Sequence, residues 1–211
     1  MLLQLALRSR YNLCAIMSKR ISGALVAALC AADSAVRTAA GAEIYRVGRA
    51  PADDAVSAWR KDSELSALLL GPNPTVNVGL AVQPETFARI HAANGAPRFI
   101  DVPPDQDARE FELHFPGNVS LDILTTREPG GSGAIARYLE KFGEGVQQVE
   151  FRCLDVARAT EILKAKFGVA PVYERNVVGG DGTRVNFFLV LLPAGHKVLI
   201  ELYELNVTNH H

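Results

Sequence analysis

Cysteine, tryptophan and methionine are scarce in this sequence of 211 residues, which has three, one and two of them. Two cysteines, Cys14 and Cys30, lie near the amino terminus, so Cys153 is alone in the rest of the chain. A lone cysteine excludes a disulfide framework in that part. The apolar run Ile21–Ala32 has 12 residues, whereas a membrane-spanning helix needs roughly 20. We therefore expect no transmembrane segment.

Acidic residues are absent from the first 32 positions, which combine Arg and Ser with Leu and Ala. This composition is typical of a mitochondrial transit peptide. Two alternatives remain open: a secretory signal that starts at Met17, or an extension that is helical or disordered in a cytoplasmic protein. Residues 1–42 have a net charge of +4 and the remainder −5. A mildly acidic body has no basic surface for nucleic acid, so we expect no nucleic-acid partner.

Turn residues and apolar periodicity divide the chain into four parts. Residues 1–42 are predicted to be a targeting or disordered leader, and residues 43–74 a linking segment. In the linking segment Asp53 and Asp54 can cap a helix that runs to about Leu70 and packs on the body. Residues 75–204 are the predicted domain, and residues 205–211 a flexible tail.

The predicted domain repeats one order of elements, which is strand, helix and three strands. The two modules are residues 75–128 and 145–204, and a bridging helix over 134–142 joins them. VNVGLAV begins the first module and VQQVEFRC the second, and these stretches carry Asn77 and Gln148 at equivalent positions. Near the module ends VSLDIL aligns with VLIELY, which pairs Asp122 with Glu201. The remaining predicted strands are 98–102 and 109–115 in the first module and 171–177 and 183–192 in the second.

Several of these stretches carry a resemblance to a known family. GEGVQQVEFRCLDVARATEILKAKFGV and KVLIELYE are similar to the second half of methylmalonyl-CoA epimerases, within the glyoxalase or vicinal-oxygen-chelate (VOC) superfamily. VGLAV and VSLDILTTREPGGSGAIARYLEKFGEG resemble the first half and its bridging helix. The resemblance covers about residues 74–204. It implies an α+β fold in which two tandem βαβββ modules form a cupped half-barrel around a divalent metal.

The resemblance also implies a ligand set, because the family's ligands come from the first and last strands of each module. The matching positions here are Asn77, Asp122, Gln148 and Glu201. The family usually has histidine at the first and third of these. Imidazole nitrogen suits zinc, cobalt and nickel, whereas Asn and Gln offer only a carbonyl oxygen. Three alternatives follow: the metal is lost and no cofactor is bound, a hard cation such as magnesium or calcium is held weakly, or the site is rearranged.

Without a metal, Asp122 and Glu201 would face each other, and the pKa of one carboxyl would rise through repulsion and burial. The NH2 groups of Asn77 and Gln148 could then donate to these carboxylates. In the family two carboxylates exchange the acidic proton beside a thioester. Glu201 matches one of them, and Asp101, or less well Asp105, is the nearest candidate for the other.

Three functions are compatible with these residues. The first is a divergent isomerase or lyase that acts on a CoA thioester or a small acid with Glu201 as base. The second is a metal-free protein that binds a small apolar or zwitterionic ligand. The third is a noncatalytic subunit, held as a homodimer or in a larger, mitochondrial assembly through the helix 53–70.

Overall fold

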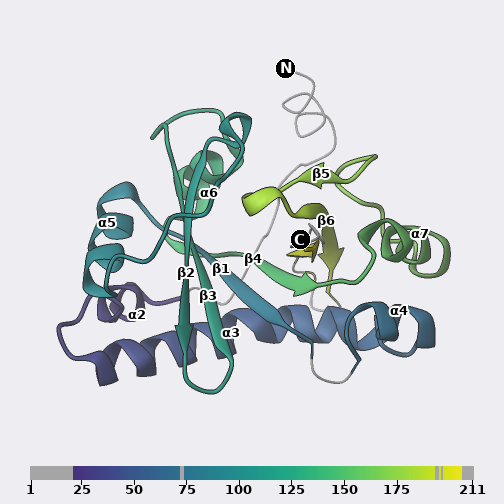
Figure 1. The fold of residues 1–211 in the computed structure, drawn as a ribbon, viewed down its shortest axis with the longest axis horizontal. Helices are drawn as coiled ribbons and strands as arrows, with labels where there is room; N and C mark the ends of the chain where they lie inside the picture. Colours follow the sequence, from purple (N-terminus) through teal and green to yellow (C-terminus); the bar gives the residue numbers. More distant parts are fainter. Residues whose placement is uncertain (1–20, 72–73, 193–194, 196, 206–211) are drawn as a thin grey trace, which may run out of the picture.

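A single mixed sheet of seven strands forms the centre of the computed structural model, which describes residues 21–71, 74–192, 195 and 197–205. The strand order is β2-β3-β1-β4-β7-β6-β5. The strands are β1 (Val76–Ala81), β2 (Ala108–Phe115), β3 (Val119–Thr126), β4 (Gly145–Arg152), β5 (Val177–Val178), β6 (Arg184–Leu191) and β7 (Lys197–Glu204). The sheet curls into a half-barrel (Figure 1), which confirms the predicted α+β class and cupped architecture.

The two predicted modules are related by the pairing of their strands. In the first module β1 pairs in parallel with β3 and places Gly79 beside Asp122. In the second, β4 pairs in parallel with β7 and places Glu150 beside Glu201. The strands β1 and β4 meet antiparallel at the centre, where Asn77 lies opposite Glu150 and Gly79 opposite Gln148. Asn77 is therefore equivalent to Gln148, as the sequence repeat predicts.

Alternation along the strands gives the sheet one apolar and one polar face. Val76, Val78 and Leu80 of β1 point into the main core, and Asn77 between them lines the concave side. The same alternation places Glu150 of β4 on the concave side and Phe151 in the core. The apolar face is covered by helices, and the polar face is left for the cup.

Helices cover the convex, apolar face of the sheet. They are α2 (Gly23–Ala28), α3 (Ser34–Trp59), α4 (Ser63–Leu68), α5 (Pro84–Ala93) and α7 (Val156–Phe167), whereas α6 (Ala134–Phe142) lies on the concave side, beside the cavity. In Figure 1, α3 runs under the middle of the sheet, between α5 at one end and α7 at the other. Its Gly48 lies against Val78 of β1 and Val146 of β4. Helix α3 thus crosses the seam between the two modules.

The amino-terminal boundary of the fold differs from the prediction. Helix α3 begins at Ser34, capped by the Asp33 carboxylate, so Asp53 and Asp54 lie inside it and do not start a helix. The segment to Leu70 is broken after Trp59, and Asp62 caps the separate helix α4. The predicted packing of this segment on the body is confirmed, because α3 contacts five strands.

The described part of the predicted leader, residues 21–42, is folded. Ile21, Val26 and Leu29 are buried in the main core beside the α3 residues Ala40 and Ile44. The folded part of the chain therefore begins earlier than residue 43. Residues 1–20 and the greater part of the predicted tail, 206–211, lie outside the described residues.

Two predicted strands are not strands of the sheet. Residues 98–102 are extended, but only Ile100 bonds to β2, through its N–H to the Glu110 carbonyl at 3.0 Å. Residues 171–176 form a bridge at Pro171 and then leave the ladder, and Val177 alone of that prediction belongs to a strand, β5. There the buried Asn186 side chain bonds to Tyr173 and Asn176 in place of backbone partners. Side-chain amides compete with sheet ladders in this way, which alternation alone does not reveal.

The remaining boundaries agree with the sequence to within one or two residues. Helix α6 covers 134–142 as predicted, and α7 begins after the Asp155 cap and ends at Gly168 with a positive φ. Two single 3-10 turns, Pro104–Gln106 and Gly180–Gly182, complete the described elements. Among the described residues, none of the helices has the length and apolar character to cross a bilayer.

Candidate functional site

A cavity of about 830 Å³ occupies the concave side of the sheet. Residues from β1, β2, β3, β4, β6 and β7 line its floor, and α6 forms one wall. Pockets of this size accommodate ligands of drug or metabolite dimensions. The cavity is therefore the candidate functional site.

A bridge formed by one segment from each module closes part of the mouth. Arg98 pairs with Asp181 at 2.5 Å, and the Asp101 N–H donates to the same carboxylate at 3.0 Å. The Gln106 side chain donates to the Val178 carbonyl at 2.7 Å. Gly180 passes so close to Ile100 that a Cβ there would lie 2.6 Å from its side chain. These contacts join residues 98–106 to residues 178–181.

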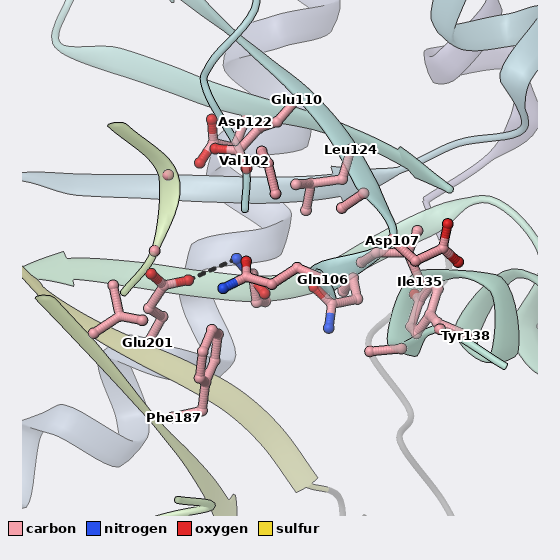
Figure 2. Close-up of a pocket in the computed structure, with 18 of the residues that line it drawn as sticks. Val102, Gln106, Asp107, Glu110, Asp122, Leu124, Ile135, Tyr138, Phe187 and Glu201 are labelled. Carbon is pink, nitrogen blue, oxygen red and sulfur yellow. Dashed lines mark hydrogen bonds between the residues drawn. The ribbon is translucent and has the colours of Figure 1, made fainter. Parts of the chain in front are cut away.

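All four residues predicted from the family pattern lie together on the floor. They stand on the four central strands, and their side chains are 2–9% exposed. The Gln148 Nε2 donates to Glu201 Oε2 at 2.8 Å, which is one of the predicted amide–carboxylate contacts (Figure 2). Asn77 Nδ2 donates at 3.3 Å to Glu112, a residue that the sequence analysis did not select.

Three further carboxyl groups reach the floor: Glu110 and Glu112 of β2, and Glu150 of β4. Gln148 Nε2 donates to Glu150 Oε1 at 2.8 Å, so its NH2 group is shared between Glu150 and Glu201. A signal for these residues was present in the sequence, because E-F-E-L and V-E-F alternate in phase with the predicted strands. The sequence does not reveal that β2 and β4 bring these glutamates to the same floor.

Four of the floor carboxyls, those of Glu110, Asp122, Glu150 and Glu201, have raised pKa values and hold their protons unusually strongly. Burial, together with the charge of Glu150, raises the pKa of Glu110 to about 8. Burial also raises the pKa of Asp122, Glu150 and Glu201, with further contributions from neighbouring carboxylates. Asp122 hydrogen-bonds both Glu110 and Glu150 through their carboxyl groups, which requires a shared proton.

Asp122 is the least satisfied member of this network. Its side chain is 2% exposed, and Oδ1 accepts no hydrogen bond from any donor in the described part of the protein. A buried carboxylate oxygen without a donor is costly. The floor is therefore incomplete as it stands, and a proton or a bound group must supply the missing contact.

The floor residues do not fit the transition metal that the family resemblance implies. No imidazole or thiolate of a described residue lines the cavity, and the amides of Asn77 and Gln148 present N–H donors to the carboxylates. Within the described ranges, no three His, Cys, Asp or Glu side chains are arranged to hold a metal ion. His91 Nε2 donates to the Pro97 carbonyl, 2.8 Å away, and the imidazole ring stacks on Phe99, outside the cavity.

Asp101 is not brought to the floor. Its side chain is exposed, and its backbone N–H and carbonyl both bond to Asp181 in the bridge. Asp105 lines the cavity at its mouth, in the first 3-10 turn. The carboxyls that share the floor with Glu201 and come from the first module's outer strand are Glu110 and Glu112.

Comparisons with known proteins agree with this architecture. No family model matches the chain, and no curated protein matches it. Among solved structures, methylmalonyl-CoA epimerase from Mycobacterium tuberculosis is 32% identical with a TM-score of 0.50, over 61% of this chain and 85% of that one. The chain belongs to the VOC superfamily. Within it, the similarity is to methylmalonyl-CoA epimerases.

Two further structures match the same part of the chain. A Streptomyces coelicolor methylmalonyl-CoA epimerase variant, in complex with 2-nitronate-propionyl-CoA, is 25% identical with a TM-score of 0.50, over 62% of this chain and 93% of that one. A hypothetical protein from Bacillus halodurans C-125 is 20% identical with a TM-score of 0.52, over 64% and 96%. The last match shows the VOC fold alone.

Proposed function

We propose that this chain is a metal-free, ligand-binding VOC protein that diverged from an epimerase-like ancestor and no longer supports efficient epimerase chemistry. The observation that carries the proposal is the shared NH2 group of Gln148, which donates to both Glu150 and Glu201 at 2.8 Å. Each of these two carboxylates therefore already uses, for a protein N–H donor, a lone pair that a metal ion would need.

The charges on the floor oppose the chemistry of an epimerase. Removing a proton beside a thioester creates an enolate, which a metal ion stabilises by several kcal/mol. Here the developing negative charge would meet Asp122, Glu150 and Glu201, and no basic side chain lines the floor among the described residues. The described residues of such a floor supply no cation to stabilise the enolate.

The metal content of the purified protein tests the proposal. We expect zinc, cobalt, nickel and manganese far below one per chain by mass spectrometry, and the same melting temperature before and after dialysis against a chelator. The double variant Asn77→His with Gln148→His should gain cobalt binding, visible as absorption of the Co²⁺ complex. Gln83→His, at an exposed position, is the control and should gain none. One transition-metal ion per wild-type chain would refute the proposal.

Proton exchange is the second candidate function, because Glu110 has a pKa of about 8 in the same cavity as Glu201. A carboxyl with a pKa near neutrality can accept and return a proton. Deuterium uptake at the α-carbon of methylmalonyl-CoA, followed by mass spectrometry, measures this activity. Exchange that is lost in Glu201→Gln and Glu110→Gln would establish the second candidate.

An assembly subunit held through residues 53–70 is less well supported. Val56, Trp59, Leu65 and Leu69 of that segment are 0–2% exposed in this chain's own core. The apolar side that would have to dock on a partner is therefore already covered. Oligomeric state by light scattering, with and without candidate partners, distinguishes this alternative.

Import into mitochondria also remains our proposal, with one refinement from the fold. Ile21, Val26 and Leu29 belong to the main core, so removal of a leader beyond residue 20 would take away buried side chains. We expect the mature amino terminus at or before Ile21. Amino-terminal sequencing of the protein from isolated organelles measures this.

A further inference from the structure

Carboxyl groups greatly outnumber basic groups around the cavity, so the cavity becomes negative wherever these carboxyls are ionised. Ten of the described side chains that line it carry carboxyl groups, and three carry basic groups. All three basic residues, Arg127, Arg137 and Lys141, come from the β3–α6 loop and α6, on one wall. Arg127 and Arg137 donate to backbone carbonyls and neutralise none of the floor carboxylates. An anionic ligand that reached the floor would meet repulsion on every side.

Buried acceptors without donors point into this negative region. Asp122 Oδ1 has no hydrogen-bond partner, although Asp122 is only 2% exposed. Gln147 Oε1, on the extra residue of the β1–β4 irregularity, is also buried without a donor and lines the same cavity. Both groups require a donor, and apart from a proton on a neighbouring carboxyl the described protein atoms supply none.

Aromatic side chains stand beside these carboxylates. Phe187 of β6 lies directly opposite Glu201 of β7 in the sheet, and Figure 2 shows its ring next to that carboxylate. Tyr173 meets the Phe187 ring edge-on with centroids 5.9 Å apart. Carboxylates combined with aromatic faces are the surroundings that bind organic ammonium groups, through charge pairing and cation–π attraction.

We propose that the cup binds a small organic amine, with the ammonium group seated between Asp122, Glu150 and Glu201 and its carbon chain against Phe187. The inference rests on the proposed metal-free function, and it names the class of ligand. An ammonium group has N–H donors for Asp122 Oδ1 and compensates the excess negative charge. The described floor residues are not arranged as the ligands of a metal ion. An ammonium group does not require that arrangement.

Three four-carbon compounds of matched size test the charge that the cup selects. Calorimetry would compare 1,4-diaminobutane, 1,4-butanediol and succinate with metal-free wild-type protein, and spermidine and tetramethylammonium would extend the amine set. We expect measurable binding of at least one amine and none of the diol or succinate. Binding should weaken at least about tenfold in Asp122→Asn and in Glu201→Gln. Glu85→Gln, at an exposed position outside the cavity, should bind as the wild type does.

The outcomes separate this inference from the proposed function. Failure of every amine to bind, or tighter binding of succinate or propionyl-CoA than of any amine, overturns the amine inference alone. Equal weakening by Glu85→Gln also overturns it, since binding would then follow overall charge. A stoichiometric transition metal in the purified protein overturns the proposed function, whatever the amines do. Circular dichroism of each variant would establish that it is folded.

Discussion

The two modules have nearly the same backbone and different chemistry. Their central positions correspond in type, with Asn77 matched to Gln148 and Asp122 to Glu201. The outer strands differ. Strand β2 brings Glu110 and Glu112 to the cup, whereas the register of β6 places Val185 and Phe187 at the equivalent positions.

The difference shows that a duplicated sheet does not enforce a duplicated site. One wall is acidic and the other is apolar and aromatic, although β2 and β6 pair with equivalent strands of their modules. The innermost strands differ in the same way, because Gly79 corresponds to Glu150. An asymmetric ligand with a charged end and an apolar part fits such a cup better than a symmetrically held ion.

Copying one module's residue into the other should have the largest effect. In Gly79→Glu the new Cβ would lie 2.6 Å from Gln148 Cγ, and another carboxyl would join Asp122. We expect the free energy of unfolding to fall by about 3 kcal/mol through overpacking and repulsion. Urea unfolding measures it. Gly79→Ala, which has the steric change without the charge, should lose about 1 kcal/mol, and equal losses would contradict the charge argument.

The carboxyls of both modules predict an unusual pH dependence. Their pKa values are raised in the folded state, so the folded protein holds protons that the unfolded chain releases near pH 4.5. This contribution is complete below that pH and is lost as the pH rises towards 8, the pKa of Glu110. At roughly 1.4 kcal/mol per pKa unit, we expect the free energy of unfolding to fall by about 5 kcal/mol from Glu110 alone over that interval, measured by urea unfolding at each pH.

A variant that removes one of the interacting carboxyls tests how much each module contributes to this pH dependence. Glu150→Gln takes a carboxyl from the second module's side of the network and relieves its repulsion of Asp122 and Glu110. The stability curve should become flatter between pH 5 and 8. A curve as steep as that of the wild type would show that the first module alone is responsible.

Helix α3 offers a test of the seam that joins the modules. A Cβ at Gly48 would lie 2.6 Å from Val78 of one module and 2.8 Å from Val146 of the other. We expect Gly48→Ala to lower the free energy of unfolding by about 1 kcal/mol, since overpacking exceeds the gain in helix propensity. Gly23→Ala, with no atom within 4 Å of its Cβ, should be neutral or stabilising.

The smallest effect is expected at the exposed contacts between α4 and α7. Arg158 pairs there with Glu64 at 2.6 Å, a contact made by the second module's helix. The first module's helix instead uses Asn94, which donates to the Leu29 carbonyl at 3.0 Å. We expect Arg158→Ala to change the melting temperature by close to the measurement error, and to have no effect in 1 M salt. A loss that persists in high salt would indicate packing by the Arg158 chain.

The sequence alone was enough to identify the duplication, because it depends on short-range patterns, and the family resemblance then selected the four central positions. Alternation of polar and apolar residues predicted β1, β3, β4 and β7 and the faces of Asn77 and Gln148. Caps and glycines predicted α7 and α6. The start of α3 was missed, since Asp53 is as good a capping residue as Asp33 when the surrounding packing is unknown.

Only the tertiary structure determined which carboxyls gather at the site and how their pKa values shift. Glu110, Glu112 and Glu150 are ordinary strand glutamates in the sequence, and curling of the sheet brings them beside Asp122 and Glu201. Asp101, which the sequence suggested, is turned outward by the bridge to Asp181. Periodicity is a property of neighbours along the chain, whereas desolvation and charge repulsion depend on neighbours in space, and these set the pKa of each carboxyl.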